Sequence, residues 1–124
     1  MIKVAIVDDN QINRITIKEK LAPYQDVLLV FEATNGEDFF DKLESLPKED
    51  YPQVVLMDLE MPILDGIVTI ASASIKFPEI KYIVLTIYED DDKIFEAIKA
   101  GASGYLLKED KARNIVEAMK NVVQ

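Results

Sequence analysis

The sequence predicts an α/β fold of the doubly wound, flavodoxin-like kind: a five-stranded parallel sheet with helices on both faces. Short apolar runs alternate five times with longer segments in which apolar residues recur at helical spacing. The apolar runs are too continuous for strands with one solvent-exposed face, which indicates strands buried on both faces of the sheet. The chain has 124 residues, 49% of them apolar, which suits one domain, residues 1–124, with its own core.

The first two strands are predicted at residues 3–7 and 27–31. The first run ends at Asp8-Asp9-Asn10, a group of residues that favour the start of a helix, and a helix follows from about Gln11 to before Pro23. After the second strand a turn at residues 34–36 leads into a helix from about Glu37. The apolar positions of that helix are Phe39, Phe40, Leu43 and Leu46.

The third strand, Val54–Met57, is the most hydrophobic and ends at Asp58. A turn-rich loop follows, then a helix from Ile67 to about Lys76 for which no N-cap is evident. The fourth strand, 82–85, ends at Thr86. A helix then begins near Asp90–Asp92 and stops at Gly101, and its apolar residues are Ile94, Phe95 and Ile98. The last two elements are a strand at 104–107, which ends at Lys108, and a helix over about 110–122.

Composition excludes several classes of function. The chain contains no cysteine and no histidine, so thiol chemistry, zinc sites built on these residues and histidine general bases are absent. With 14 basic and 23 acidic residues the net charge is −9, which argues against contact of this domain with nucleic acid or an anionic membrane. No stretch is apolar enough to span a bilayer and the start lacks a signal-peptide pattern, so we expect a cytoplasmic location.

Polar residues follow four of the predicted strands. In an open parallel sheet the carboxyl ends of the strands meet at one edge, where ligands bind. Asp8 and Asp9, Asp58, Thr86 and Lys108 are therefore expected to lie together. Taken singly, each could be an ordinary cap or loop residue, but Asp58 follows four buried residues, where an ionised carboxylate is costly unless it is paired or metal-bound. Close carboxylates suit Mg²⁺, and an aspartate can act as a nucleophile toward phosphorus.

The sequence resembles the receiver domain of two-component response regulators over essentially its whole length. The matching segments are Val7-Asp8-Asp9-Asn10, Met57-Asp58-Leu59-Glu60-Met61-Pro62-Ile63-Leu64-Asp65-Gly66, Leu85-Thr86 and Gly101-Ala102-Ser103-Gly104-Tyr105-Leu106-Leu107-Lys108. The resemblance implies strand order 2-1-3-4-5. It also implies a phosphorylation-activated switch: Asp58 accepts a phosphoryl group from the phosphohistidine of a sensor histidine kinase.

The resemblance further implies a role for each residue of the site. The metal ligands for Mg²⁺ would be Asp8, Asp9, Asp58 and the backbone carbonyl of Glu60. Lys108 would pair with the phosphoryl oxygens. Thr86 would move to hydrogen-bond the phosphoryl group, and Tyr105 resembles the switch aromatic that turns inward when Thr86 moves.

Three residues are predicted to tune how long the phosphoryl group survives. In the family that the sequence resembles, two variable positions border the path of water to the phosphoryl group. Here Glu60 and Tyr88 occupy them, and the bulk of Ile87 would narrow the same opening. We expect the steric effect of Tyr88 to dominate, giving a long lifetime. Glu109 stands where many receivers have a proline after a cis peptide, and we expect a trans bond because a cis bond before Glu costs about 2.5–4 kcal/mol.

The segment around Tyr105 is most similar to the subfamily with a C-terminal helix-turn-helix output domain, NarL/LuxR-like. The main hypothesis is therefore control of transcription through a DNA-binding domain outside this chain, with a homodimer on phosphorylation. The alternative is a stand-alone receiver that acts by protein–protein interaction. A receiver-like module that never turns over phosphate, and an enzyme such as a flavin domain or an Asp-dependent phosphatase, fit the motifs less well. A phosphate-binding loop is missing, and Asp58 is followed by Leu59-Glu60 rather than by a second Asp two positions on.

Overall fold

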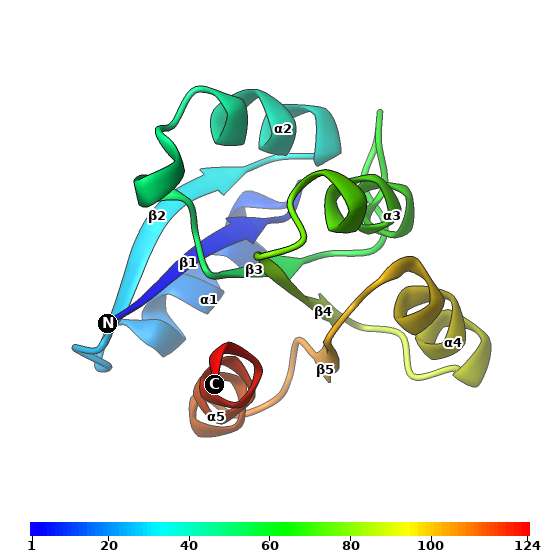
Figure 1. Cartoon of the computed structure of the whole chain (residues 1–124). Coiled ribbons are helices and arrows are strands. Elements are labelled where there is room, and N and C mark those ends of the chain that lie inside the picture. The colour runs from blue at the N-terminus through cyan, green and yellow to red at the C-terminus, as the bar shows by residue number, and fades with distance from the viewer.

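The computed structural model describes all residues, 1–124, and contains one five-stranded parallel sheet in the order β2-β1-β3-β4-β5 (Figure 1). The predicted fold class and strand order are both confirmed. The elements are β1 (Ile2–Val7), α1 (Gln11–Leu21), β2 (Val27–Ala33), α2 (Gly36–Glu44), the 3₁₀ turn η1 (Lys48–Asp50), β3 (Val54–Met57), α3 (Gly66–Lys76), β4 (Lys81–Thr86), α4 (Asp91–Ala100), β5 (Gly104–Leu107) and α5 (Ala112–Val123).

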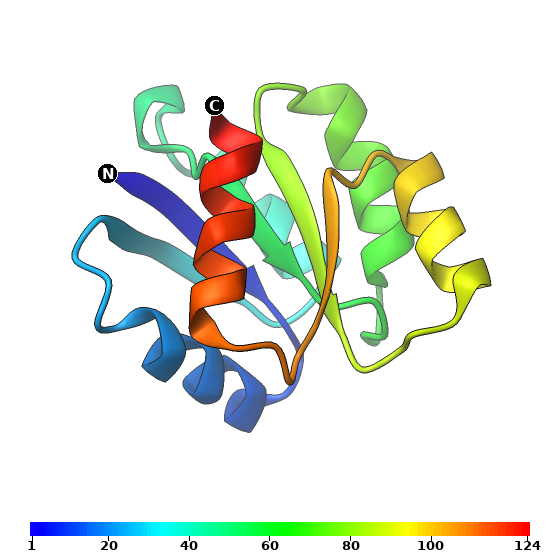
Figure 2. The same ribbon diagram turned by 90° about the horizontal axis from the view of Figure 1, so that it is seen from below.

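Helices cover both faces of the sheet and divide the core into two layers (Figures 1 and 2). On one face α2, α3 and α4 pack through buried residues such as Phe39, Ile70 and Ala97. On the other face α1 and α5 pack through residues such as Ile17 and Ile115. The three central strands are buried on both sides, which explains their unbroken apolar runs. No helix has the length and apolar character that a membrane crossing requires.

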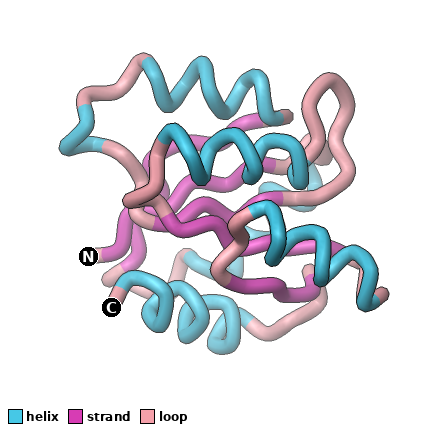
Figure 3. The backbone as a smooth tube through the Cα atoms, turned by 45° about the vertical axis from the view of Figure 1, so that its right-hand side comes forward, coloured by secondary structure: helices cyan, strands magenta, loops and turns pink.

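The strand register brings the carboxyl ends of the central strands level with one another. Val7 pairs with Met57, and Met57 pairs with Val84. The backbone N–H of Asp58 donates to the carbonyl of Val7 at 2.9 Å. Residues that directly follow these strands therefore share one edge of the molecule, and the tube in Figure 3 shows the loops gathered there.

Helix starts follow the sequence pattern, with one correction. Asn10 caps α1 and Asn35 caps α2, each through its side-chain oxygen. The prediction that the helix near residue 67 has no cap is wrong: Asp65 accepts a hydrogen bond from the backbone N–H of Val68 at 3.0 Å. The sequence pattern hides this cap, because Gly66 looks like part of the preceding turn. In the structure Gly66 is already the first residue of the helix, which makes Asp65 its N-cap.

The other differences from the predicted elements concern where two elements end and how exposed two side chains of α4 are. The second strand continues to Ala33, and α2 ends at Glu44, so Leu46 lies beyond it. Phe95 and Ile98, expected on the apolar stripe of α4, are 68% and 51% exposed. Helix α4 packs on the sheet through Ala97 instead, because this small side chain lets the backbone of the helix lie close to the sheet. No peptide bond is cis, so the bond before Glu109 is trans as expected.

Gly66 holds the loop after β3 against the strand end, because a methyl group at this position would overlap the carbonyl oxygen of Asp58. We expect Gly66→Ala to lower the free energy of unfolding by roughly 2–3 kcal/mol, measured by urea denaturation. The control is Gly104→Ala, where the added carbon would lie 3.5 Å from Ile83, an ordinary contact. Equal stability of the two variants would contradict the role assigned to Gly66.

Candidate functional site

Three carboxylates meet at the carboxyl edge of the sheet, as the sequence predicted. Asp8 and Asp9 follow β1, Asp58 follows β3, and one oxygen atom from each lies within 4.8 Å of the others. Asp8 is 1% exposed and Asp58 is 7% exposed, whereas Asp9 is exposed. Two buried carboxylates and one at the surface form an acidic cluster, which we call the acidic pocket.

The carboxylate oxygens of Asp8 have different surroundings. Oδ1 accepts a hydrogen bond from the backbone N–H of Asn10 at 2.9 Å. Oδ2 is buried and accepts no well-directed hydrogen bond, although Lys108 Nζ lies 2.8 Å away. A buried carboxylate oxygen is costly unless a cation is close, and the single Lys108 ammonium provides one positive charge for three carboxylates. The three acidic residues therefore fit a hard divalent cation, which takes oxygen ligands from carboxylates.

Lys108 reaches into this pocket from the end of β5. Its Nζ lies 2.8 Å from Asp8 Oδ2 and 3.2 Å from Asp58 Oδ1. Burial by itself favours the neutral amine, but the hydrogen bond and charge interactions with the two carboxylates outweigh it and raise the pKa of Lys108. The ammonium group is thus held charged beside the two buried aspartates.

Asp58 has an unusual electrostatic environment. Burial, and then repulsion from Asp8, raise the pKa of Asp58 to about 6, while Lys108 acts in the opposite direction. Oδ1 of Asp58 is engaged twice, by Lys108 and by the backbone N–H of Leu59 at 3.0 Å. No hydrogen bond engages Oδ2, so Oδ2 is the oxygen available for another partner.

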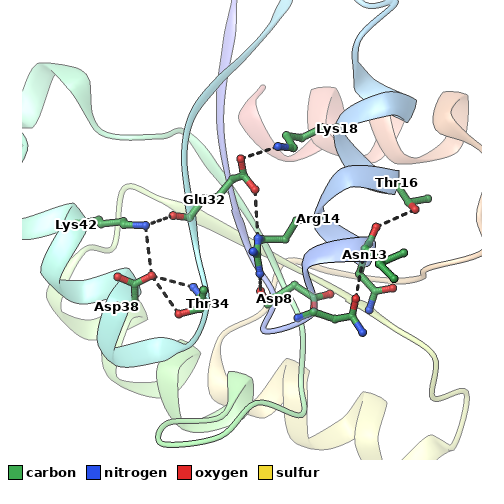
Figure 4. A network of polar contacts seen from close by, with 11 residues as sticks. Asp8, Asn13, Arg14, Thr16, Lys18, Glu32, Thr34, Asp38 and Lys42 are labelled. Carbon is green, nitrogen blue, oxygen red and sulfur yellow. Dashed lines mark hydrogen bonds and ion pairs between the residues drawn. The ribbon is translucent and has the colours of Figure 1, made fainter.

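Arg14, which is not among the predicted site residues, supports the backbone of Asp8. Arg14 of α1 donates to the carbonyl oxygen of Asp8 at 2.7 Å and pairs with Glu32 of β2 at 3.2 Å. Lys18 holds the other oxygen of Glu32 at 2.9 Å (Figure 4). Figure 4 shows the Arg14 side chain between Glu32 and Asp8, so its guanidinium group joins β2 to the residue that follows β1. In the sequence Arg14 looks like any solvent-exposed arginine of a helix, apart from its position along that helix. The sequence therefore gives little indication of its contacts with Asp8 and Glu32.

Thr86 and Tyr105 are joined through the backbone of one residue between them. Thr86 is fully buried, and its Oγ1 accepts a hydrogen bond from the backbone N–H of Tyr88 at 3.3 Å. Tyr105 is half-buried, and its hydroxyl donates to the carbonyl oxygen of Tyr88 at 2.7 Å. The loop between β4 and α4 therefore connects the predicted switch residues.

The predicted tuning residues differ in their surroundings. The neighbouring Glu60 carboxylate raises the pKa of the Tyr88 phenol, and Asp58 adds a smaller effect in the same direction. Lys93 Nζ lies 5.2 Å from the centre of the Tyr88 ring. Glu60 and Lys93 also line a groove of about 610 Å³ between the loop after β3 and α4. Ile87 is 70% exposed, so its side chain packs against little.

A family model described as "Response regulator receiver domain" matches residues 4–120. The chain is 35% identical over 123 residues to the transcriptional regulatory protein DegU of Brevibacillus brevis, covering 99% of this chain and 50% of that protein. It is 37% identical over 120 residues to LiaR of Bacillus subtilis (strain 168), covering 97% and 55%. The chain thus spans about half the length of these curated relatives.

A solved structure gives the same result for the fold. A DNA-binding response regulator of the LuxR family from Staphylococcus aureus superposes with a TM-score of 0.88 at 24% identity, over 100% of both chains. This similarity agrees with the strand order and with the family model. The chain therefore belongs to the receiver-domain family of two-component response regulators.

Proposed function

We propose that Asp58 accepts a phosphoryl group from the phosphohistidine of a sensor histidine kinase in a Mg²⁺-dependent reaction. The observation that carries this proposal is the position of Asp58: a nearly buried carboxylate beside Lys108, with a free oxygen and two further aspartates. In the transfer, Asp58 Oδ2 attacks phosphorus, the phosphorus–nitrogen bond to the imidazole breaks, and the imidazole leaves with the electron pair.

The residues of the acidic pocket have separate roles in this proposal. Asp8, Asp9, Asp58 and the backbone carbonyl of Glu60 would hold Mg²⁺. Bound there, the cation supplies positive charge for the carboxylates and for the transferred oxygens. Lys108 already points at Asp58 Oδ1 and adds a second positive charge beside the incoming group. Arg14 keeps the backbone of Asp8 in place.

The switch is proposed to work through Tyr88. When the Thr86 hydroxyl turns to donate to a phosphoryl oxygen, it gives up the hydrogen bond from the Tyr88 N–H. The loop that carries the Tyr88 carbonyl then loses one anchor, and Tyr105, which is bonded to that carbonyl, changes position with it. Phosphorylation would thus shift the population between two packings of the α4–β5–α5 face.

We further propose an output for this switch. The relatives DegU and LiaR are transcriptional regulators about twice as long as the matched region, which supports a DNA-binding domain in the same regulator. The receiver itself, with a net charge of −9, would make no contact with DNA. Phosphorylated copies would form a homodimer through the α4–β5–α5 face or through α1 and α5. A stand-alone receiver remains the second candidate, since this chain holds all of the switch residues.

Asp58→Asn should abolish phosphorylation, because an amide is a very poor nucleophile. The wild-type protein, incubated with Mg²⁺ and acetyl phosphate, should gain the mass of one phosphoryl group, and the variant should gain none. Asp41→Asn, an exposed change on α2, is the control and should behave as wild type. Modification of Asp58→Asn at the wild-type rate would disprove the assignment.

Mg²⁺ should stabilise the fold, since it binds the folded site and not the unfolded chain. The gain is RT ln(1 + [Mg²⁺]/Kd), about 1.4 kcal/mol at ten times Kd, and appears as a higher melting temperature. Asp9→Asn removes one acidic residue of the pocket and should reduce the shift, whereas Asp41→Asn should keep it. A melting temperature that does not respond to millimolar Mg²⁺ would count against a metal site.

Asp58 should destabilise the cation-free protein at neutral pH. Its pKa of about 6 in the folded state exceeds the ordinary value of 3.8. The folded protein therefore holds more protons at Asp58 between these values, and its contribution to stability falls as the pH rises through this window. Asp58→Asn should raise the free energy of unfolding by about 1–2 kcal/mol near pH 7, and the gain should shrink toward pH 4. Urea titrations at both pH values test this, and a gain independent of pH would contradict it.

Tyr88→Ala should speed dephosphorylation several-fold, about 1 kcal/mol of barrier, because the ring no longer blocks water beside Asp58. Tyr88→Phe keeps the ring and loses only the phenol near Glu60, so its phosphoryl group should last about as long as in wild type. The measurement is loss of the phosphorylated mass over time at fixed Mg²⁺. If Tyr88→Ala leaves the half-life unchanged, the shielding role is wrong.

A further inference from the structure

Lys20, in the last turn of α1, bonds to the loop that carries Lys108. Its Nζ donates to the carbonyl oxygen of Lys108 at 2.8 Å and to that of Asp110 at 3.0 Å. These partners are 88 and 90 residues away in the sequence. Figure 2 shows α1 and the start of α5 on the same face of the sheet, with the β5–α5 loop passing between them. Lys20 therefore connects α1 to the backbone of Lys108, whose side chain lies in the acidic pocket.

The segment that Lys20 holds is a closed turn. The N–H of Asp110 donates to the carbonyl of Leu107 at 3.0 Å, and Asp110 Oδ2 accepts from the N–H of Leu107 at 2.9 Å. On the side facing β4, the N–H of Lys108 donates to the carbonyl of Thr86 at 2.8 Å. The backbone of this turn is thus hydrogen-bonded to β4, and the side chain of Lys20 hydrogen-bonds the same turn to α1.

This second attachment matters because the Lys108 side chain is long and flexible. Glu109 follows Lys108, so no proline ring restricts the backbone here. Small movements of the turn would shift Nζ from its positions 2.8 Å from Asp8 and 3.2 Å from Asp58. Asp8 lies in the short connection between β1 and α1. A bond from α1 to the turn therefore limits the movement of Lys108 relative to Asp8.

We propose that Lys20 is a positioning residue for phosphoryl transfer: it holds the 107–110 turn so that Lys108 Nζ stays beside Asp58. The proposal rests on the proposed function of Asp58. Lys20 does not touch the reacting atoms, and its effect passes through Lys108. The competing explanation is that the Lys20 charge merely attracts the anionic phosphodonor.

The kinetic test uses the whole chain with Mg²⁺ and acetyl phosphate, which avoids any effect on kinase docking. Lys20→Met keeps most of the aliphatic stem and removes the ammonium group. It should slow phosphorylation of Asp58 about tenfold, as expected when a catalytic group is misplaced slightly. Lys20→Arg can still donate to two carbonyl groups and should restore the rate to within about twofold. Lys120→Met removes the same charge from α5, where Lys120 pairs with Asp26, and should have little effect.

A double-variant cycle separates positioning from simple attraction. In a Lys108→Met background, Lys20→Met should cause no further slowing, because the residue through which it acts is gone. A tenfold effect that persists in this background, or no effect of Lys20→Met in the wild-type background, would overturn the proposal.

Nuclear magnetic resonance of the unphosphorylated protein gives a readout that does not depend on the reaction. In Lys20→Met the Lys108 side-chain methylenes should become more mobile, and the amides of Leu107 and Lys108 should exchange faster, while Leu85 in β4 is unchanged. Unaltered mobility of Lys108 would overturn the proposal. If wild-type protein takes up no phosphoryl group, the function of Asp58 is wrong, and the resonance data alone decide whether Lys20 positions Lys108.

Discussion

The burial of two aspartates at the edge of a parallel sheet is the constraint on which the rest of the structure depends. Asp8 and Asp58 are almost inaccessible, and burial together with repulsion from Asp8 raises the pKa of Asp58. Hydrophobic strands that end level with one another force this proximity. The cost is offset by Lys108, whose ammonium lies within 3.2 Å of both carboxylates. The site thus holds three carboxylates against one ammonium group, an excess of negative charge.

The backbone around this pocket is held by contacts from three directions. Arg14 binds the carbonyl of Asp8, the absence of a side chain at Gly66 lets the loop after β3 close over the carbonyl of Asp58, and Lys20 binds the turn that bears Lys108. All three act on main-chain oxygens or on space beside them, not on the acidic side chains. Such support lets the charged groups keep their geometry although they repel one another.

Tyr88 has a place in both of the proposed roles, the switch and the protection of the phosphoryl group. Its backbone lies between the Thr86 hydroxyl and the Tyr105 hydroxyl, and the Glu60 carboxylate raises the pKa of its phenol. Under the proposed function, a movement of Thr86 toward the phosphoryl group would act on the same residue that is proposed to limit the access of water. The lifetime of the phosphoryl group would then be coupled to the conformation that phosphorylation favours.

The sequence by itself determined the fold class, the five strands and the residues at their ends. Apolar runs that alternate with helical segments indicate a parallel sheet covered by helices on both faces, and parallel strands bring Asp8, Asp58 and Lys108 to one edge. The tertiary structure decided which oxygen of Asp58 is free, and that Phe95 stays exposed while Ala97 packs. It also decided that Arg14 binds the backbone carbonyl of Asp8, 6 residues away, and that Lys20 binds the carbonyl of Lys108, 88 residues away. Carbonyl groups are present at every residue, so no sequence pattern distinguishes the acceptors that a lysine or arginine will meet; only the packing of α1 against the sheet and α5 selects them.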